Sequence, residues 1–189
     1  YFEESELDIV LEHVSNDTYL KTYNIQSPII NNSSLLESSI NIEAVKEDLS
    51  LDLNLTIFEN LDVKKQSDRY EYVFPNYNVY KVFKESEQSK GVFSLNSSGY
   101  AKNYNTNVNE KIMINDFYYK SHSKFNKNGI KNNYNYLLKN INTNADNSLK
   151  YESKTDHNLV SLIEYNSTYP LEKKIGKYSN ILKPKISLR

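Results

Sequence analysis

Histidine is the residue type with the widest range of catalytic chemistry, and the three histidines of this sequence stand far apart. His13, His122 and His157 each lie among ordinary polar residues. His157 follows Asp156, which could orient its imidazole as a base for a serine. Adjacent residues of a strand point to opposite faces, so this pair is badly placed for a proton relay. The carboxylate pairs Glu3-Glu4 and Glu47-Asp48 are expected in turns, as solvated charges.

No motif of an enzyme or cofactor site is present in the sequence. It lacks a Gly-x-Ser-x-Gly elbow, a phosphate-binding loop, a His-Glu-x-x-His pair and a dinucleotide glycine cluster. Cysteine is absent, which excludes disulfides, thiolate metal sites and a cysteine nucleophile. We therefore predict no catalytic, cofactor-binding or metal-binding residue, and no enzyme activity.

Charge and length restrict the classes of partner and of fold. The formal net charge is −1, without a long basic or acidic run, so a nucleic-acid partner is not expected. No apolar run reaches the roughly 18 residues of a transmembrane helix. The chain opens with Tyr1 and Phe2, and a strand-like alternation runs to Arg189, so both ends look cut. We expect one partial domain over residues 1–189, an internal piece of a longer protein.

Residues 49–57 carry the clearest structural signal of the sequence. Every odd position is a large aliphatic residue and every even position is polar, which predicts a strand with one apolar face. Such a strand fits a soluble sandwich, whose apolar face lines a core. It also fits a membrane barrel, in which the aliphatic residues face lipid and the polar residues face an aqueous lumen. The pattern alone does not separate these two environments.

Further strands are predicted along most of the chain. Residues 35–44 and 49–57 are separated by the short polar break Lys46-Glu47-Asp48, which predicts an antiparallel hairpin. In all we expect roughly nine strands, several longer than the average of about five to six residues, which favours an all-β, up-and-down barrel. The other predicted strands cover residues 7–14, 68–80, 91 to about 100–104, 111–119 with a break at 115–116, 149–151, 158–165 and 182–189.

Several connections are also predicted from local residue types. Asp17 is expected to cap a single helical turn, and Pro75, which has no backbone N–H, to mark a bulge or a strand end. Asn115-Asp116 suggests an irregularity or a change of the apolar face. The polar residues 121–147 predict a long loop, with only a short strand at 134–138, and residues 169–174 predict a turn. The 17 tyrosines fit a sugar-binding surface, an interfacial belt, or common β-formers.

Three short segments, taken together, resemble one known family. They are VSNDTYL at 14–20, DRYEYVFP at 68–75, and YPL at 169–171 followed by LKPKI at 182–186. In this order they are similar to the C-terminal barrel region of the LPS-assembly protein LptD family, also called the organic solvent tolerance family. The resemblance spans most of the chain and depends on the combination of the three segments.

The resemblance implies a protein of the cell outer membrane of Gram-negative bacteria that transports lipopolysaccharide to the outer leaflet. It implies a periplasmic jellyroll followed by a very large transmembrane barrel, of which this chain would form an early-to-middle part with an open, incomplete sheet. The implied partners are lipopolysaccharide, outer-membrane lipid, an LptE-like plug lipoprotein and an LptA-like periplasmic bridge. The lateral gate would lie outside this segment. The lack of cysteine departs from members that have inter-domain disulfides.

On this hypothesis the two faces of residues 49–57 have different surroundings. Lipid would contact Leu49, Leu51, Leu53, Leu55 and Ile57, and the lumen would contact Ser50, Asp52, Asn54 and Thr56. Two alternatives remain: another outer-membrane barrel, such as a porin or receptor, and a soluble β-sandwich or solenoid module, such as an adhesin. A second sheet packed on the leucines would favour the sandwich.

Overall fold

The computed structural model describes residues 2–24, 32–85, 90–105 and 107–189. Strands make up most of it, and the two helices α1 (Tyr19–Tyr23) and α2 (Gln66–Arg69) are a turn long each. The strands are β1 (Glu4–Val10), β2 (Leu35–Lys46), β3 (Leu49–Asn60), β4 (Tyr70–Val82), β5 (Gly91–Tyr104), β6 (Val108–Ser121), β7 (Lys124–Phe125), β8 (Lys131–Asp146), β9 (Thr155–Thr168), β10 (Leu171–Ile175), β11 (Tyr178–Leu182) and β12 (Lys185–Leu188).

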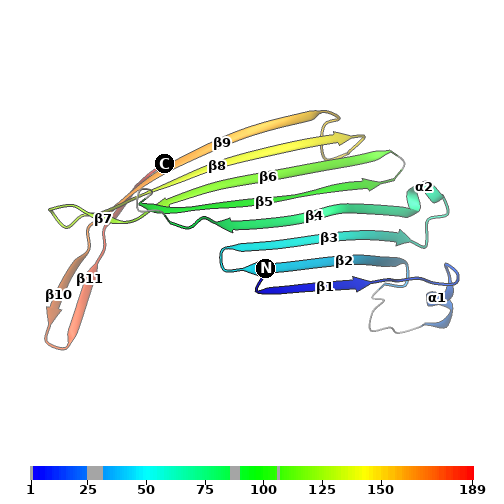
Figure 1. Ribbon diagram of the computed structural model, residues 1–189, viewed down its shortest axis with the longest axis horizontal. Helices are drawn as coiled ribbons and strands as arrows, with labels where there is room; N and C mark the ends of the chain where they lie inside the picture. The colour runs from blue at the N-terminus through cyan, green and yellow to red at the C-terminus, as the bar shows by residue number, and fades with distance from the viewer. Residues whose placement is uncertain (1, 25–31, 86–89, 106) are drawn as a thin grey trace.

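One large antiparallel sheet contains all the described strands except β10 and β11. Its order is β1-β2-β3-β4-β5-β6-β8-β9-β12, and β7 pairs with β8, so nearly every strand lies beside its neighbour in the sequence. Figure 1 shows β1 at one edge of this sheet and β9 near the other, with the β10–β11 hairpin extending away from it. The predicted all-β, up-and-down architecture is confirmed, and the sheet is open rather than closed into a barrel.

Alternation and strand register divide the side chains between two faces. We call one the Leu53 face and the other the Asn54 face, after adjacent residues of β3. Leu53 lies opposite Ile42 of β2 and Tyr77 of β4, whereas Asn54 lies opposite Asn41 and Asn76. Across β1–β4 the Leu53 face is therefore mainly apolar, with Lys46 and Lys81 beside the β2–β3 turn, and the Asn54 face is mainly polar. The predicted division of residues 49–57 between two faces is confirmed.

No second sheet of the described residues covers the Leu53 face. The β10–β11 hairpin is the other described sheet, and the side chains of residues 171–174 and 178–182 in it are exposed. Leu7 and Ile9 of β1 keep 62% and 56% of their surface exposed, and the leucines of β3 are half-buried by their neighbours in the sheet. Among the described residues, the packed layer that a sandwich requires is not found.

The described residues form one small buried apolar cluster, at the end of the sheet where β2 begins. Leu20 of α1 packs with Leu36 of β2 and Leu61, and Val14 packs against these three. Each buried leucine contributes about 1.5–3 kcal/mol by leaving water. This burial holds α1 against β2 and against Leu61, which follows β3.

The predicted loop over residues 121–147 is wrong. Ser121 ends β6, and residues 131–146 form β8, the longest strand of the sheet, at 16 residues. Its asparagines bond across strands: Asn115 donates to Asn140 Oδ1 at 3.2 Å, and Asn135 donates to Glu164 Oε1 at 3.0 Å. Polar side chains that satisfy one another in this way are compatible with a strand interior.

At Asn115-Asp116 the sequence predicted either an irregularity of the strand or a change of the apolar face, and the structure shows the change of face. The backbone of β6 pairs with β5 and β8 without a register shift there. The apolar side chains do change face, because Ile112 and Ile114 lie on the Asn54 face while Phe117 lies on the Leu53 face. The separate prediction of a bulge at Pro75 is confirmed, because the register of β4 shifts between Val73 and Asn76.

Smaller predictions also have clear outcomes. The tight β2–β3 hairpin and the helical turn of α1 are confirmed. Asp17 does not cap that turn; Thr18 is at the N-cap, without a side-chain cap, and Asp17 binds Arg69 instead. Residues 149–151 form no strand, and 169–174 are not simply a turn, because β10 begins at Leu171 and pairs with β11. The first strand ends at Val10 rather than at residue 14.

Candidate functional site

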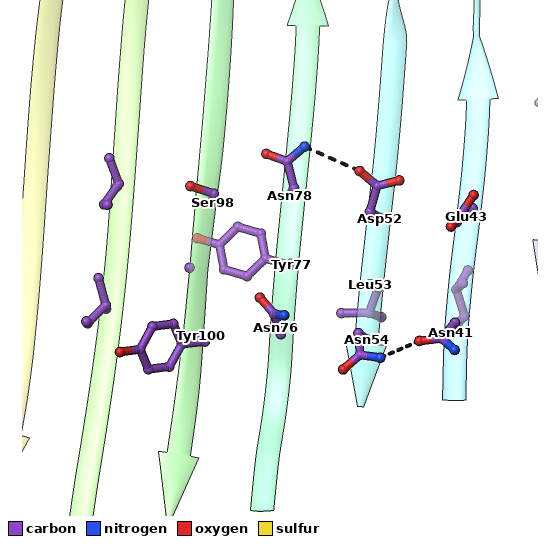
Figure 2. A pocket seen from close by; sticks show the side chains of 14 residues that line it. Asn41, Glu43, Asp52, Leu53, Asn54, Asn76, Tyr77, Asn78, Ser98 and Tyr100 are labelled. Carbon is purple, nitrogen blue, oxygen red and sulfur yellow. Dashed lines mark hydrogen bonds between the residues drawn. The ribbon is translucent and has the colours of Figure 1, made fainter. Parts of the chain in front are cut away.

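The middle of the Asn54 face carries a continuous polar surface. Asn41, Asn54, Asn76 and Tyr100 lie directly opposite one another on β2, β3, β4 and β5. Figure 2 shows this row, with Asn54 donating to Asn41. Asn54 Oδ1 also accepts from the Thr56 hydroxyl at 2.5 Å. The row therefore presents amides and a phenol held in place by their neighbours.

A second row lies beside the first and adds carboxylates. It consists of Glu43, Asp52, Asn78 and Ser98, again on four neighbouring strands (Figure 2). Asn78 Nδ2 donates to Asp52 Oδ2 at 3.3 Å. Glu6 of β1 lies opposite Glu43, which extends the acidic character to the sheet edge. This part of the face attracts cations and hydrogen-bond donors.

The two rows line a shallow depression of about 340 Å³. Its polar lining comes from β2–β5, and on the β6 side it is bordered by Ile112 and Ile114. Amide, hydroxyl and carboxylate groups can hydrogen-bond the hydroxyls of a sugar or water, and the isoleucines can contact an apolar group. The depression is thus suited to contact with an amphiphile rather than to covalent chemistry.

A buried carboxylate organises the end of this face near Tyr104. Glu110 of β6 is only 5% exposed, and it accepts from Tyr104 at 2.9 Å, from Ser148 at 2.5 Å and from Tyr100 at 3.5 Å. Lys102 lies close by and pairs with Glu71 at 2.7 Å. Glu110 thus ties the β8–β9 connection to the sheet and accepts a hydrogen bond from Tyr100, which borders the depression.

The structure does not bring the candidate catalytic residues together. His122, just after β6, pairs with Glu85, whereas His157 Nδ1 on β9 lies 2.8 Å from Asn142 Oδ1 of β8. His157 and Asp156 point to opposite faces of β9, as expected from strand alternation. The described residues contain no group of three or more His, Asp or Glu side chains that could hold a metal ion.

Sequence reasoning identified only the β3 part of the polar surface. Asp52 and Asn54 were predicted to share a face, but Asn41, Asn76 and Tyr100 were not placed with them. The signal was available in principle, since each of these residues lies in an alternating strand joined to the next by a short connection. What was missing was the register between strands.

An ion-pair cluster joins two distant segments at the end of the sheet where α1 lies. Arg69 binds Asp17 through Nη2 and Nη1 at 2.6 and 3.0 Å, and its Nη2 lies 2.6 Å from Glu59 Oε1. The hydrogen bonds that Arg69 donates to Asp17 and Glu59 raise the pKa of its guanidinium, and the bond to Asp17 lowers the pKa of that carboxyl. Lys21 likewise lowers the pKa of Asp62 by a hydrogen bond. These contacts supplement the burial of Leu20.

Acid is expected to loosen the α1 segment. The pKa of Asp17 and of Asp62 is lower in the folded chain, so both carboxylates stabilise the fold above about pH 4, the ordinary aspartate value. That stabilisation disappears as the pH falls through the lowered folded pKa. Hydrogen exchange of residues 17–24, corrected for intrinsic rates, should show lower protection at about pH 3 than at pH 6. Asp17→Asn should reduce this difference, and equal protection of the native chain at both pH values would contradict the prediction.

Comparison with known proteins gives no family assignment. Neither a scan against protein-family models nor a search of curated proteins finds a match for this chain. The helices among the described residues are too short and too polar to cross a membrane. The two faces of the sheet, and the three short segments that resemble the LptD family, are therefore the features that bear on function.

Proposed function

We propose that this chain is part of the wall of an outer-membrane β-barrel of the LptD type, and that it takes part in delivering lipopolysaccharide to the outer leaflet. The Leu53 face contacts the hydrocarbon of the bilayer, and the Asn54 face lines an aqueous lumen. The role is transport, without a catalytic step.

The uncovered Leu53 face of long strands is the observation that carries this proposal. β3 alone presents five aliphatic side chains on this face, and no layer of the described residues packs on them. Complete burial of such a side chain is worth about 1.5–3 kcal/mol, so leaving five half-exposed to water forgoes several kcal/mol. Strands of 12–16 residues also exceed the length that a tilted strand needs to cross a bilayer.

The Asn54 face supports the choice of an amphiphilic cargo. Lipopolysaccharide has a sugar-phosphate head, which needs hydrogen-bonding partners, and acyl chains, which must avoid water. The depression combines polar rows on β2–β5 with Ile112 and Ile114 on β6. Its acidic side at Glu43 and Asp52 would repel phosphates, so the head group is expected nearer to Asn76 and Ser98.

Two of the segments that resemble the LptD family meet in space. The segment at 14–20 contributes Asp17 and Leu20, and the segment at 68–75 contributes Arg69, which binds Asp17. Residues far apart in the sequence that form one contact cluster act as a structural unit, which supports reading the two segments together. The plug lipoprotein and the periplasmic bridge are proposed from the resemblance only.

Photocrosslinking in cells tests the proposed function. A photoreactive phenylalanine analogue at Asn76 or Ser98 is expected to crosslink lipopolysaccharide, and the same analogue at Leu53 is expected to crosslink phospholipid instead. The Leu53 position serves as the matched control, because it lies on the other face at the same level of the sheet. Phospholipid adducts at Leu53 without lipopolysaccharide adducts at Asn76 or Ser98 would favour a different outer-membrane barrel. Absence of both adduct types would favour a water-soluble module.

A further inference from the structure

A groove lined by aromatic rings lies on the Leu53 face near the start of β5, and we call it the aromatic groove. Its volume is about 490 Å³, and the surface inside it is apolar. The rings of Phe93 and Tyr119 are in contact there, with their centroids 4.5 Å apart. Such a groove accepts a hydrocarbon chain. The lining residues on this face are Phe83, Phe93, Phe117, Tyr119, Tyr136 and Leu138.

A second hollow, of about 430 Å³, adjoins the aromatic groove, and we call it the basic hollow. Tyr119 lines both, so the two are direct neighbours. Lys90, which precedes β5, and Lys124 of β7 are among the residues that line the basic hollow. The backbone fixes their positions, because the His122 N–H donates to the Lys90 carbonyl oxygen at 2.9 Å and Lys124 pairs with Asn132 of β8.

The basic hollow carries an excess of positive charge. The described residues that line it include no aspartate or glutamate. Neither Lys90 nor Lys124 forms an ion pair with another described residue, whereas Lys81 on the same face pairs with a carboxylate. The imidazole of His122, which also lines the hollow, pairs with Glu85. The two lysine ammonium groups are therefore available to an anionic ligand.

We propose that the aromatic groove and the basic hollow together bind one anionic phospholipid, with an acyl chain in the groove and the phosphate beside Lys90 and Lys124. Lysine binds phosphate as a point charge, and aromatic side chains are favoured where hydrocarbon meets lipid head groups. The groove suits the one or two chains of a phospholipid better than the larger acyl cluster of lipopolysaccharide. The inference rests on the proposed function, because the Leu53 face must meet lipid, and it adds a lipid site on the face opposite the depression.

The concave shape distinguishes this site from a belt of separate aromatic side chains. Gly91, opposite Ser121 at the edge of the groove, has no side chain, and a Cβ there would lie only 2.7 Å from Cε2 of Tyr119. The Tyr119 ring therefore occupies space that any other residue at position 91 would need. A hollow shaped in this way, with two lysines that lack a carboxylate partner among the described residues, should select lipids by the charge of the head group.

Photoactivatable lipids test the site in the full-length protein, reconstituted in vesicles of phosphatidylcholine. The probes are traces of phosphatidylglycerol, which is anionic, and of phosphatidylcholine, which is zwitterionic, both with the same diazirine-labelled acyl chain. Mass spectrometry measures the adducts on peptides that contain Phe93 or Phe117. We expect the anionic probe to label these peptides at least about fivefold more than the zwitterionic probe, because each lysine near an anionic head group adds attraction. Lys90→Gln combined with Lys124→Gln should make the two yields equal.

Lys46→Gln combined with Lys111→Gln is the matched control. It removes the same charge from the Leu53 face, at two exposed positions that do not line the site, so the anionic preference should persist. The amount of folded protein is compared first for both double variants, by heat-modifiable mobility.

The other outcomes separate the lipid site from the membrane crossing. Equal labelling by both probes in the native protein would overturn the site and leave the crossing intact. Loss of the anionic adducts on addition of lipopolysaccharide, but not of unlabelled phosphatidylglycerol, would also overturn it, because the occupant would then be lipopolysaccharide. Absence of adducts from both probes would contradict the crossing itself, and with it the proposed function.

Discussion

Leu53→Arg is expected to abolish assembly of the protein into the outer membrane. Leu53 is the central aliphatic residue of the Leu53 face on β3, between Ile42 and Tyr77. An arginine facing lipid near the bilayer midplane costs about 2–4 kcal/mol, and the apolar packing of the leucine side chain disappears as well. This is a large part of the stability of an ordinary domain, about 5–15 kcal/mol. The measurement is the amount of folded protein in the outer membrane, read from its heat-modifiable mobility.

Asn54→Arg is the matched control, because it places the same side chain one residue away on the other face. Asn54 shares its row with Asn41 and Asn76, where a lumen would let the guanidinium stay hydrated. We expect most of the protein to assemble, and Asn54→Asp to have a mild effect. Equal amounts of folded protein for Leu53→Arg and Asn54→Arg would contradict the assignment of faces.

Gly99→Ala is expected to disrupt the pairing of β5 with β6. A Cβ at this position would overlap with the carbonyl oxygen of Ile112 and would lie 3.1 Å from Met113 Cα. Both neighbours belong to the backbone, so neither can move without separating the strands. The Tyr77 ring, 3.1 Å from the same point, occupies the space above the glycine. Overpacking commonly costs about 1–3 kcal/mol, and a backbone clash of this kind should reach the upper part of that range.

Ala101→Ser provides the comparison for Gly99→Ala. Both substitutions add one heavy atom on the Leu53 face of β5, but position 101 already accommodates a Cβ. The urea midpoint of the folded protein in detergent micelles should fall clearly for Gly99→Ala and little for Ala101→Ser. An unchanged midpoint for Gly99→Ala would show that β5 and β6 are not as close as the structure has them.

The sequence was sufficient for features that depend on one strand at a time. The alternation of residues 49–57 predicted the strand and the division of its side chains between two faces, because side chains of a strand repeat with a period of two. The β2–β3 hairpin and the bulge at Pro75 also followed from local rules, since turn residues and a missing N–H act on their immediate neighbours.

Local composition was misleading where polar side chains have partners on other strands. The asparagines of β8 predicted a loop, but Asn140 binds Asn115 of β6 and Asn135 binds Glu164 of β9. Nothing within residues 121–147 reveals these partners. The β10–β11 hairpin was also missed, because residues 169–174 predicted only a turn.

Only the tertiary structure decided which residues share a level of the sheet. The polar row of Asn41, Asn54, Asn76 and Tyr100 depends on the register between strands. Sequence pattern specifies the face of a residue, because the period is a property of the single strand. Register is set by the lengths of the connections and by the bulge in β4, so it becomes defined only when the strands pair.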